Sequence, residues 1–363
     1  MHPWTHRIRA MAFVALASCA SPAIAQAAAS TAHDYRDRNF DYFVSGDPAA
    51  PRASHTTYGL ALMGGGGKVD AAFKFIAERA GGGHVVILGA VSDDSFDPAD
   101  GAYGKSYMTQ WGPVTSAETI IFHHREASSD PRVLAALRNA DGIFLEGGDQ
   151  SSYIKYWKGT GVQDALNAHV KANRPIGGSS AGLAILGHYS YTALDGGSME
   201  SKVALANPFD SGVTLETDFL HIRNLESVVT DTHFSARSRL GRLITFIARL
   251  QKENDKNIVG IGVDEHTALL VDENGSAKLA VGSHGSAWMV TPQEPAQLVA
   301  GKPLTMRNIQ LTRIDAKSRV DVPAHKVEAA GATITMSIDG GKLVEPSIAS
   351  KMLMRDRALP DES

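Results

Sequence analysis

Short apolar runs that alternate with helical patterns limit the fold of this chain more than any other feature. Such runs predict buried strands at 58–63, 84–90, 119–122, 142–145 and 175–177. Helical patterns separate or follow them, at 69–80, 131–139, 162–172 and 181–186. Strands and helices that alternate in this way build a parallel sheet with helices on both faces. The sequence therefore predicts an α/β fold with a doubly wound parallel sheet.

The pattern changes near Asn257, after which strand-like segments with alternating polarity dominate. We interpret residues 291–363 as a β-rich C-terminal extension and tail, and residues 26–57 as a polar lead-in. The α/β domain itself is predicted over residues 58–290.

Residues 1–25 have the pattern of a secretory signal peptide. Arg7 and Arg9 precede an apolar run over 10–20, and Ala23–Ala25 offers a small-residue cleavage site. The run is too short to cross a bilayer, and no later segment is long enough. Cys19 follows Leu-Ala-Ser, which resembles a lipoprotein signal, so ordinary cleavage and acylation of Cys19 both stay open. We expect an exported protein, periplasmic or secreted, with a lipid on Cys19 as its only route to a membrane.

Charge and cysteine content exclude several classes of protein. The chain has 35 Lys and Arg against 39 Asp and Glu, a formal net charge of -4, which argues against a dedicated nucleic-acid-binding protein. Cys19 is the only cysteine, so the mature chain has neither a disulfide nor a cysteine nucleophile. It also lacks an H-E-x-x-H or Cys/His pattern, so no metal or cofactor is expected.

The segment Gly178–Gly182 carries the strongest chemical signal, a G-x-S-x-G pattern between a strand and a helix. In a nucleophile elbow, glycines at both ends let the chain turn sharply and expose the serine hydroxyl. Ser180 is therefore the candidate nucleophile, and the N–H of Ala181 is a candidate oxyanion donor. The alternative is a turn of small residues that only packs a strand against a helix.

His233 is the best candidate for the base that a serine nucleophile needs. It follows the apolar pair Val228-Val229 and precedes Arg237, Arg239 and Arg242. A histidine in such surroundings is an unusual core residue. The arginines taken alone are equally typical of a solvated helix face.

Two glycine segments complete the candidate site. Gly147 and Gly148 follow the strand 142–145, so the Gly148 N–H is a candidate second oxyanion donor and Gln150 a candidate substrate contact. Most such pairs are only turns. The run Gly64–Gly67 lacks the Ser/Thr and spacing of a P-loop, and we interpret it as a close-approach turn below the site.

Four segments together resemble cyanophycinase and its relatives, the serine peptidase family that also holds the aspartyl dipeptidases. These segments are Gly147–Gln150, Gly178–Gly182, Asp231–Leu243 and Gly262–Ala268. Over residues 58–290 the resemblance implies a flavodoxin-like fold of the class I glutamine amidotransferase type. It also implies a Ser-His-acid triad in the chain order Ser, acid, His.

The resemblance assigns Ser180 as nucleophile and His233 as base, but it leaves the triad acid open. Spacing from the serine favours Asp195, spacing from the histidine favours Asp210, and Glu200 lies between them. The residues that fall on the family's substrate-binding surface are Gln150, Asp231, Arg237, Arg239 and Arg242. Thr232 stands where cyanophycinases have Gln, so the substrate stays open between cyanophycin, a β-aspartyl dipeptide and other aspartyl material.

These observations predict an exported serine peptidase that hydrolyses aspartyl bonds, above all β-aspartyl or isopeptide bonds, through an acyl-enzyme. The arginines fit this substrate because guanidinium groups bind carboxylates in pairs of hydrogen bonds. Two alternatives stay open, an esterase of the α/β-hydrolase class and a non-catalytic binding module that uses the same cleft. The expected partner is a peptide or aspartyl polymer, and the oligomeric state is open, a homodimer included.

Overall fold

The computed structural model describes residues 34–91, 111–195, 197–253, 257–329 and 331–344. The predicted signal segment, residues 1–25, lies outside the described residues. Among the helices of the described ranges, none has both the length and the apolar character that a membrane span requires.

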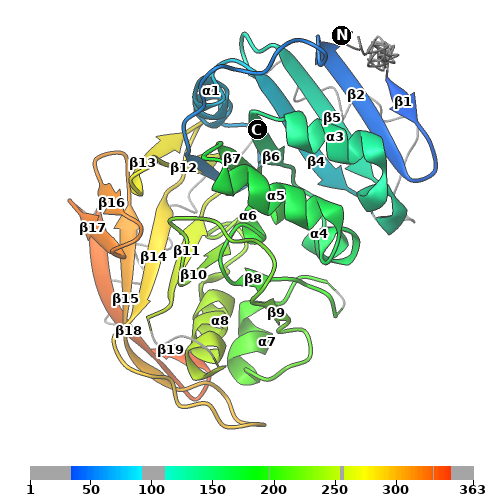
Figure 1. Ribbon diagram of the computed structural model, residues 1–363. Coiled ribbons are helices and arrows are strands. Elements are labelled where there is room, and N and C mark those ends of the chain that lie inside the picture. Colours follow the sequence, from blue (N-terminus) through cyan, green and yellow to red (C-terminus); the bar gives the residue numbers. More distant parts are fainter. Residues whose placement is uncertain (1–33, 92–110, 196, 254–256, 330, 345–363) are drawn as a thin grey trace, which may run out of the picture. The chain divides into compact units, whose positions relative to one another are not determined.

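Five parallel strands form the centre of the larger sheet, in the spatial order β5-β4-β6-β7-β3 (Figure 1). Their bounds are β3 (Leu60–Met63), β4 (His84–Ala90), β5 (Ser116–Phe122), β6 (Gly142–Leu145) and β7 (Ile176–Ser179). The predicted α/β class is confirmed, and the predicted strands coincide with these to within a few residues. Strands buried on both faces read as unbroken apolar runs, which is why the sequence located them.

Antiparallel strands extend this sheet to eleven strands among the described residues, so the sheet is mixed rather than wholly parallel. On one side lie β1 (Tyr35–Arg36) and β2 (Phe40–Gly46); on the other lie β12 (Thr267–Val271), β13 (Ser276–Val281), β16 (Arg319–Asp321) and β17 (Lys326–Glu328). The predicted polar lead-in therefore contains a strand, β2, which lies between β1 and β5 and pairs with β5 over its whole length.

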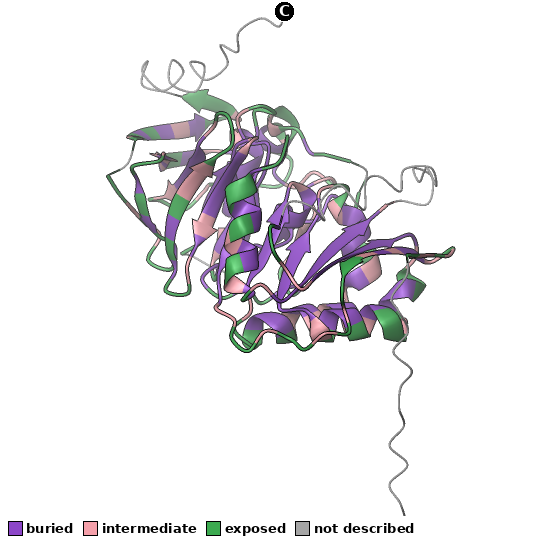
Figure 2. Cartoon of the chain, turned by 90° about the horizontal axis from the view of Figure 1, so that it is seen from above, coloured by how far each residue is buried: buried purple, intermediate pink, exposed green. Residues whose placement is uncertain are grey.

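Helices cover both faces of the parallel centre. Helix α1 (Asp70–Arg79) packs Phe73 and Ile76 on one face. The other face is covered by α3 (Pro131–Asn139), α4 (Gln150–Trp157), α5 (Gly161–Lys171) and the short α6 (Ala181–Ala184), with a 3-10 turn, η1 (Arg125–Ser129). Figure 2 shows the result, with buried strands between helices whose outer sides are exposed.

Helix starts follow local sequence signals. Asp130 accepts a hydrogen bond from Arg132 N at the start of α3, where Pro131 takes the first helical position. Asp149 accepts from Ser151 N at the start of α4, and Thr160 from Val162 N at the start of α5. These caps fix where each helix leaves the sheet.

A second, six-stranded sheet carries the other half of the site (Figure 1). It has the order β10 (Val228–Asp231), β11 (Val259–Val263), β14 (Ala287–Pro292), β15 (Met306–Ile314), β18 (Ala332–Asp339), β19 (Lys342–Val344). Helix α8 (Leu240–Glu253) packs on β10 and β11, next to α7 (Ser201–Ala206). A two-stranded sheet, β8 (Ser190–Tyr191) with β9 (Leu215–Glu216), completes this half. The predicted β-rich C-terminal region is confirmed.

Candidate active site

The turn between β7 and α6 has the shape of a nucleophile elbow. Ser180 adopts φ 52° and ψ -116°, a strained conformation for a residue with a side chain. A Cβ on Gly178 would lie 2.6 Å from the carbonyl carbon of Gly182, and a Cβ on Gly182 would lie 2.1 Å from Leu145 O. Only glycines fit at these two positions, so their spacing around Ser180 has a direct steric cause.

The Ser180 hydroxyl contacts the imidazole of His233, which in turn contacts the carboxylate of Glu265. We call these three side chains the relay. Ser180 Oγ lies 2.7 Å from His233 Nε2, and His233 Nδ1 lies 2.5 Å from Glu265 Oε1. A carboxylate only accepts hydrogen bonds, so Nδ1 carries the proton and Nε2 is left to accept from the hydroxyl. The arrangement is that of a serine, its base and an orienting acid.

Glu265 corrects the expected triad acid, because neither Asp195 nor Asp210 is placed against His233. Asp195 is exposed, and Asp210 accepts a hydrogen bond from Gly212 N in its own turn. Glu200, which lies between them, is exposed and lines a neighbouring pocket. Glu265 lies beyond His233 in the chain, outside the Ser, acid, His order that the resemblance implied.

Both sheets contribute to the relay. His233 follows β10 and Glu265 follows β11, and these strands are parallel neighbours, so their ends point the same way. The start of β12 pairs with the end of β3, which brings Glu265 beside the glycine run that follows β3. Ser180 comes from the end of β7, the other neighbour of β3. The candidate nucleophile Ser180 thus comes from one sheet, while His233 comes from the other.

The glycine run Gly64–Gly67 lets the backbone pass directly beneath these side chains. His233 N donates to Gly64 O at 2.8 Å. Gly65 has φ +97°, and a Cβ there would lie 2.5 Å from His233 Nε2 and 3.1 Å from Ser180 Cβ. The expected close-approach turn is therefore what the structure contains.

Asp264 fixes the turn that carries His233. Its carboxylate accepts from Ser235 N at 2.9 Å, from Ser286 N at 3.0 Å and from Trp288 Nε1 at 3.1 Å. Asp264 is buried, so these three hydrogen bonds satisfy a group that would otherwise be costly to bury. Asp264 supports the fold, while its neighbour Glu265 reaches the imidazole.

The surroundings of His233 favour the neutral imidazole that a general base requires. Burial lowers the pKa of His233, the hydrogen bond that it donates to Glu265 opposes that lowering, and the charges of Arg237 and Arg239 add to it. Burial raises the pKa of Glu265, but the hydrogen bond and charge of His233 and the charge of Arg237 outweigh it, so that this pKa is lowered. Both shifts favour an ionised Glu265 beside a neutral His233.

The predicted oxyanion donors lie at the same sheet edge as Ser180. Strands β6 and β7 are parallel neighbours, so Gly147 and Gly148 follow β6 beside the elbow. A Cβ on Gly147 would lie 3.4 Å from Ser180 Cβ and 3.9 Å from Ser180 Oγ. Ala181 is the first residue of α6, where helix geometry leaves N–H groups unpaired. Gln150 begins α4 just beyond Gly148 and is half-buried.

Two of the predicted substrate contacts are instead a buried ion pair. Arg242 Nε and Nη2 donate to the Asp231 carboxylate at 2.8 and 2.5 Å, and each residue is 2% exposed. The prediction that Asp231 and Arg242 face substrate is therefore wrong. The forked pairing joins the end of β10 to the start of α8 on either side of His233, which is why both residues accompany the histidine in the sequence.

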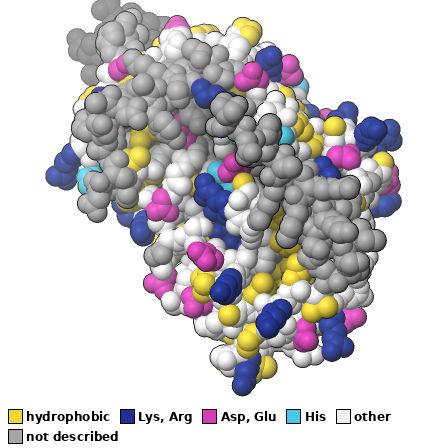
Figure 3. Space-filling model, turned by 180° about the vertical axis from the view of Figure 1, so that it is seen from behind, with side chains coloured by type: hydrophobic (Ala, Val, Ile, Leu, Met, Phe, Trp, Pro, Cys, Tyr) yellow, Lys and Arg dark blue, Asp and Glu magenta, His cyan; other side chains and the backbone are white. Residues whose placement is uncertain are grey.

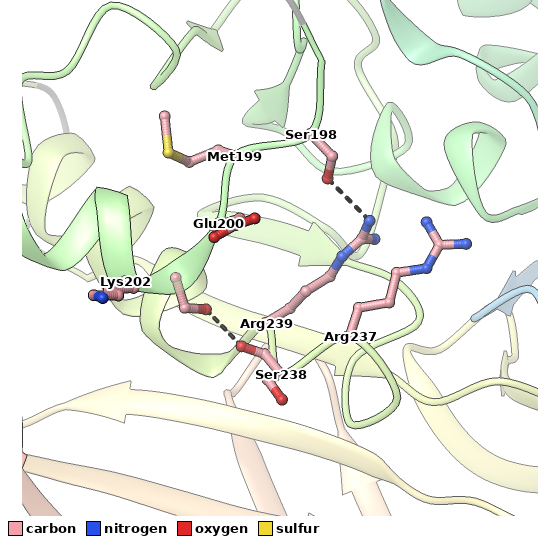
Figure 4. A pocket seen from close by; sticks show the side chains of 8 residues that line it. Ser198, Met199, Glu200, Lys202, Arg237, Ser238 and Arg239 are labelled. Atoms are coloured by element: carbon pink, nitrogen blue, oxygen red, sulfur yellow. Dashed lines mark hydrogen bonds between the residues drawn. The ribbon is translucent and has the colours of Figure 1, made fainter.

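Arg237 and Arg239 do face a pocket. The pocket has a volume of about 530 Å³ and is lined by Ser198, Met199, Glu200, Ser201, Lys202, Arg237, Ser238 and Arg239. Figure 4 shows the two guanidinium groups side by side. Arg237 is exposed, whereas Arg239 is 7% exposed and burial lowers its pKa to about 10.

Hydrogen bonds hold Arg239 in place beside this pocket. Its Nη1 donates to Thr232 O and Oγ1, each at 2.9 Å, and its Nη2 donates to Ser198 Oγ at 3.2 Å. Ser201 Oγ also donates to Ser238 O at 2.6 Å, which ties the two walls together. A guanidinium that is buried, fixed and beside an open pocket is suited to bind an anionic group.

On the face in Figure 3, acidic and basic side chains are interspersed, with basic side chains grouped next to a histidine near the middle of the view. No group of three or more His, Cys, Asp or Glu side chains that could hold a metal ion occurs in the described part of the chain.

Comparison with known proteins places the chain in a family. The model of Peptidase family S51 matches residues 116–279. A cyanophycinase from Synechococcus elongatus is 30% identical over 259 residues, which cover 69% of this chain and 74% of that protein. The chain belongs to peptidase family S51.

Two further cyanophycinases are similar to this chain, and the share of each chain that is aligned differs between them. A cyanophycinase from Trichormus variabilis is 30% identical over 200 residues, 53% of this chain and 61% of that protein, so the match spans less than two thirds of it. A cyanophycinase from Geminocystis herdmanii is 22% identical over 253 residues, 68% of this chain and 86% of that protein.

Two solved structures are also similar to the chain. A peptidase from an acI-B1 Actinobacterium has a TM-score of 0.45 and 15% identity, and the alignment covers 78% of this chain and 98% of that chain. A putative peptidase E from Listeria monocytogenes has a TM-score of 0.40 and 15% identity, covering 63% of this chain and 100% of that chain.

Sequence reasoning missed Glu265 as the acid beside His233. This residue lies in the segment Gly262–Ala268, which the resemblance had already singled out. The acidic pair Asp264-Glu265 in this segment is the sequence signal for it, but the expected order Ser, acid, His places the acid between Ser180 and His233.

Proposed function

We propose that this S51 chain is an exported serine peptidase that hydrolyses aspartyl bonds, with β-aspartyl or isopeptide bonds preferred. The observation that carries the proposal is the relay Ser180–His233–Glu265, with distances of 2.7 and 2.5 Å. Membership of the family supports the same chemistry, and the names of the relatives support aspartyl material as the substrate class.

The relay supplies the steps of acyl transfer. Ser180 Oγ attacks the scissile carbonyl while His233 Nε2 takes its proton, and Glu265 stabilises the imidazolium that forms. The N–H groups of Gly148 and Ala181 hold the oxyanion. The imidazolium then gives its proton to the leaving amine, and a water molecule activated by His233 hydrolyses the acyl-enzyme.

The arginine pocket gives the substrate preference. A β-aspartyl bond leaves the α-carboxylate of aspartate close to the scissile carbonyl, so a cation beside the relay meets it directly. Arg237 is near enough to affect the pKa of both His233 and Glu265, and Arg239 contributes a fixed guanidinium on the same side. A charge-assisted hydrogen bond of this kind contributes about 1.5–3 kcal/mol.

Export is supported by the signal pattern in residues 1–25. The mass of the mature N-terminus distinguishes cleavage before Gln26 from acylation at Cys19.

The proposal is tested by Ser180→Ala with Ser179→Ala as the matched control, since the two serines are adjacent and only Ser180 has glycines two positions away on both sides. The substrates are cyanophycin, a panel of β-aspartyl dipeptides, neutral peptides and a p-nitrophenyl ester. We expect Ser180→Ala to lower kcat by about 10⁴- to 10⁶-fold and Ser179→Ala to keep most activity.

Other outcomes would favour the alternatives. Turnover of the ester without peptide cleavage indicates an esterase. Failure of a fluorophosphonate to label the wild type, together with no turnover, indicates a binding module. Equal loss in both serine variants would contradict the assignment of the nucleophile.

A further inference from the structure

We infer that Tyr153 is a positioning residue: its hydroxyl fixes the peptide between Gly147 and Gly148 so that the Gly148 N–H faces the oxyanion. The inference rests on the proposed serine chemistry. It adds a residue that takes no part in proton transfer. Tyr153 belongs neither to the relay nor to the motifs found in the sequence.

The hydroxyl of Tyr153 is held against two consecutive carbonyl groups. Its oxygen lies 2.9 Å from both Glu146 O and Gly147 O, and its one proton is shared between these two acceptors. The side chain is 0% exposed, and its ring stacks on Trp157 with centroids 4.4 Å apart and planes 3° apart. Trp157 in turn packs edge-on against Phe122 of the sheet. The ring therefore has no freedom to move the hydroxyl away from these carbonyls.

Because a peptide unit is planar, a hydrogen bond at Gly147 O also sets the direction of the Gly148 N–H. In a trans peptide the C=O and the following N–H point in opposite directions. Because Tyr153 binds Gly147 O, the Gly148 N–H is directed to the side away from Tyr153. Gly147 borders Ser180, with a Cβ position only 3.9 Å from Ser180 Oγ. Among the described residues no backbone carbonyl accepts a hydrogen bond from the Gly148 N–H.

A fixed peptide is needed here because two glycines in sequence rotate easily. Gly148 has φ +142°, a region that residues with side chains rarely adopt, and it is exposed. A rotated Gly147–Gly148 peptide would present its carbonyl oxygen, which repels an oxyanion. The Tyr153 hydrogen bond favours the productive orientation, and donation to the carbonyl also polarises the N–H of the same peptide.

The test is Tyr153→Phe, which keeps the stacked ring and removes only the hydroxyl. Tyr156→Phe is the matched control, since Tyr156 lies on the same helix and its hydroxyl also donates to a backbone carbonyl, Val91 O. Loss of a whole oxyanion donor typically lowers kcat by about 10²- to 10³-fold. For a donor that is present but no longer fixed, we expect Tyr153→Phe to lower kcat by about tenfold to a hundredfold, with KM changed less than about twofold.

A second measurement needs no known substrate. The rate at which a fluorophosphonate labels Ser180 should fall by a similar factor in Tyr153→Phe, because the phosphoryl oxygen uses the same donors, and Tyr156→Phe should label at the wild-type rate. Incorporation of 4-aminophenylalanine at position 153 restores a donor and should recover the labelling rate. If Tyr153→Phe does not fold, the 4-aminophenylalanine protein is compared with Tyr153→Leu, a variant that has no donor. Equally slow labelling of these two folded proteins would contradict the inference.

The outcomes separate this inference from the proposed function. If Ser180→Ala abolishes turnover and labelling while Tyr153→Phe leaves both unchanged, the positioning role is wrong and the nucleophile stands. A rise in KM alone would also overturn it. If Ser180→Ala is labelled and active like the wild type, the serine chemistry itself is wrong.

Discussion

Arg237 and Glu265 act on the same imidazole in opposite directions. The charge of Arg237 lowers the pKa of His233, while the hydrogen bond of Glu265 raises it, and burial, the largest influence, lowers it. At the scale of single residues, these influences together favour a neutral His233 into mildly acidic solution. The acid limb of the kcat/KM profile should lie below the ordinary histidine value of 6.5.

Arg237→Gln should move this limb to higher pH, because it removes a charge that lowers the pKa of His233. The same change removes a guanidinium from the pocket, so the preference for a β-aspartyl dipeptide over its amide-capped analogue should fall by about tenfold to a hundredfold. The measurement is kcat/KM for both substrates between about pH 4 and 9. Lys202→Gln, in the same pocket, is the control for loss of charge. An unchanged limb and an unchanged preference would mean that Arg237 is only a solvated side chain.

The sequence located Ser180 and His233 because each stands in a distinctive local segment, and the structure brings the two together; their roles stay predictions. The partner of His233 could not be located in this way. Glu265 is 32 residues further on, beyond a helix and a strand, and only the parallel pairing of β10 with β11 makes the two neighbours. Asp231 and Arg242 were misassigned for a related reason, because sequence does not distinguish a buried ion pair from two groups that face a substrate.

At the scale of helices and strands, a strand could be predicted from the sequence when both of its faces are buried. Strands β3, β4 and β6 are unbroken apolar runs and were located, whereas β2 was not. In β2 the buried Asp41 interrupts the apolar pattern; its carboxylate accepts a hydrogen bond from Arg36, and His123, just after β5, has its Nε2 3.4 Å from Asp41 Oδ1. A strand of this kind looks polar in the sequence because its pairing with other strands is not visible there.

The ion pair between β10 and α8 should act on stability rather than on substrate binding. Arg242→Met removes the two-pronged partner of Asp231 and leaves this buried carboxylate with Arg239 Nη1 at 3.7 Å, and breaking a buried pair typically costs about 3–5 kcal/mol. We expect urea unfolding to show a loss of this size, with KM of the remaining folded enzyme changed less than about twofold. Arg249→Met, which removes a surface pair with Glu253 on the same helix, should cost less than about 1 kcal/mol. A large rise in KM with little loss of stability would instead support the prediction that Arg242 contacts the substrate.

At the scale of the whole molecule, Glu146 makes the stability of the fold depend on pH. Its carboxyl group is 0% exposed at the end of β6, and neither oxygen has a hydrogen-bond partner within the described ranges. Burial raises the pKa of Glu146 well above the ordinary 4.5, and the charge of Lys68 opposes this only in part. The folded state therefore holds the proton more tightly than the unfolded chain does, so this contribution to stability is present at low pH and is lost as pH rises towards the raised pKa.

Glu146→Gln should therefore stabilise the protein increasingly as pH rises above about 4.5. Between the unfolded and folded pKa values, the advantage of the variant should grow by about 1.4 kcal/mol per pH unit, because one proton is bound by the folded wild type and not by its unfolded chain. Urea unfolding at pH 5, 6, 7 and 8 measures this difference, and the exposed Glu226→Gln is the control. A difference between Glu146→Gln and the wild type that stays constant over this range would mean that Glu146 is ionised in the folded protein, which its position without hydrogen-bond partners at the sheet edge argues against.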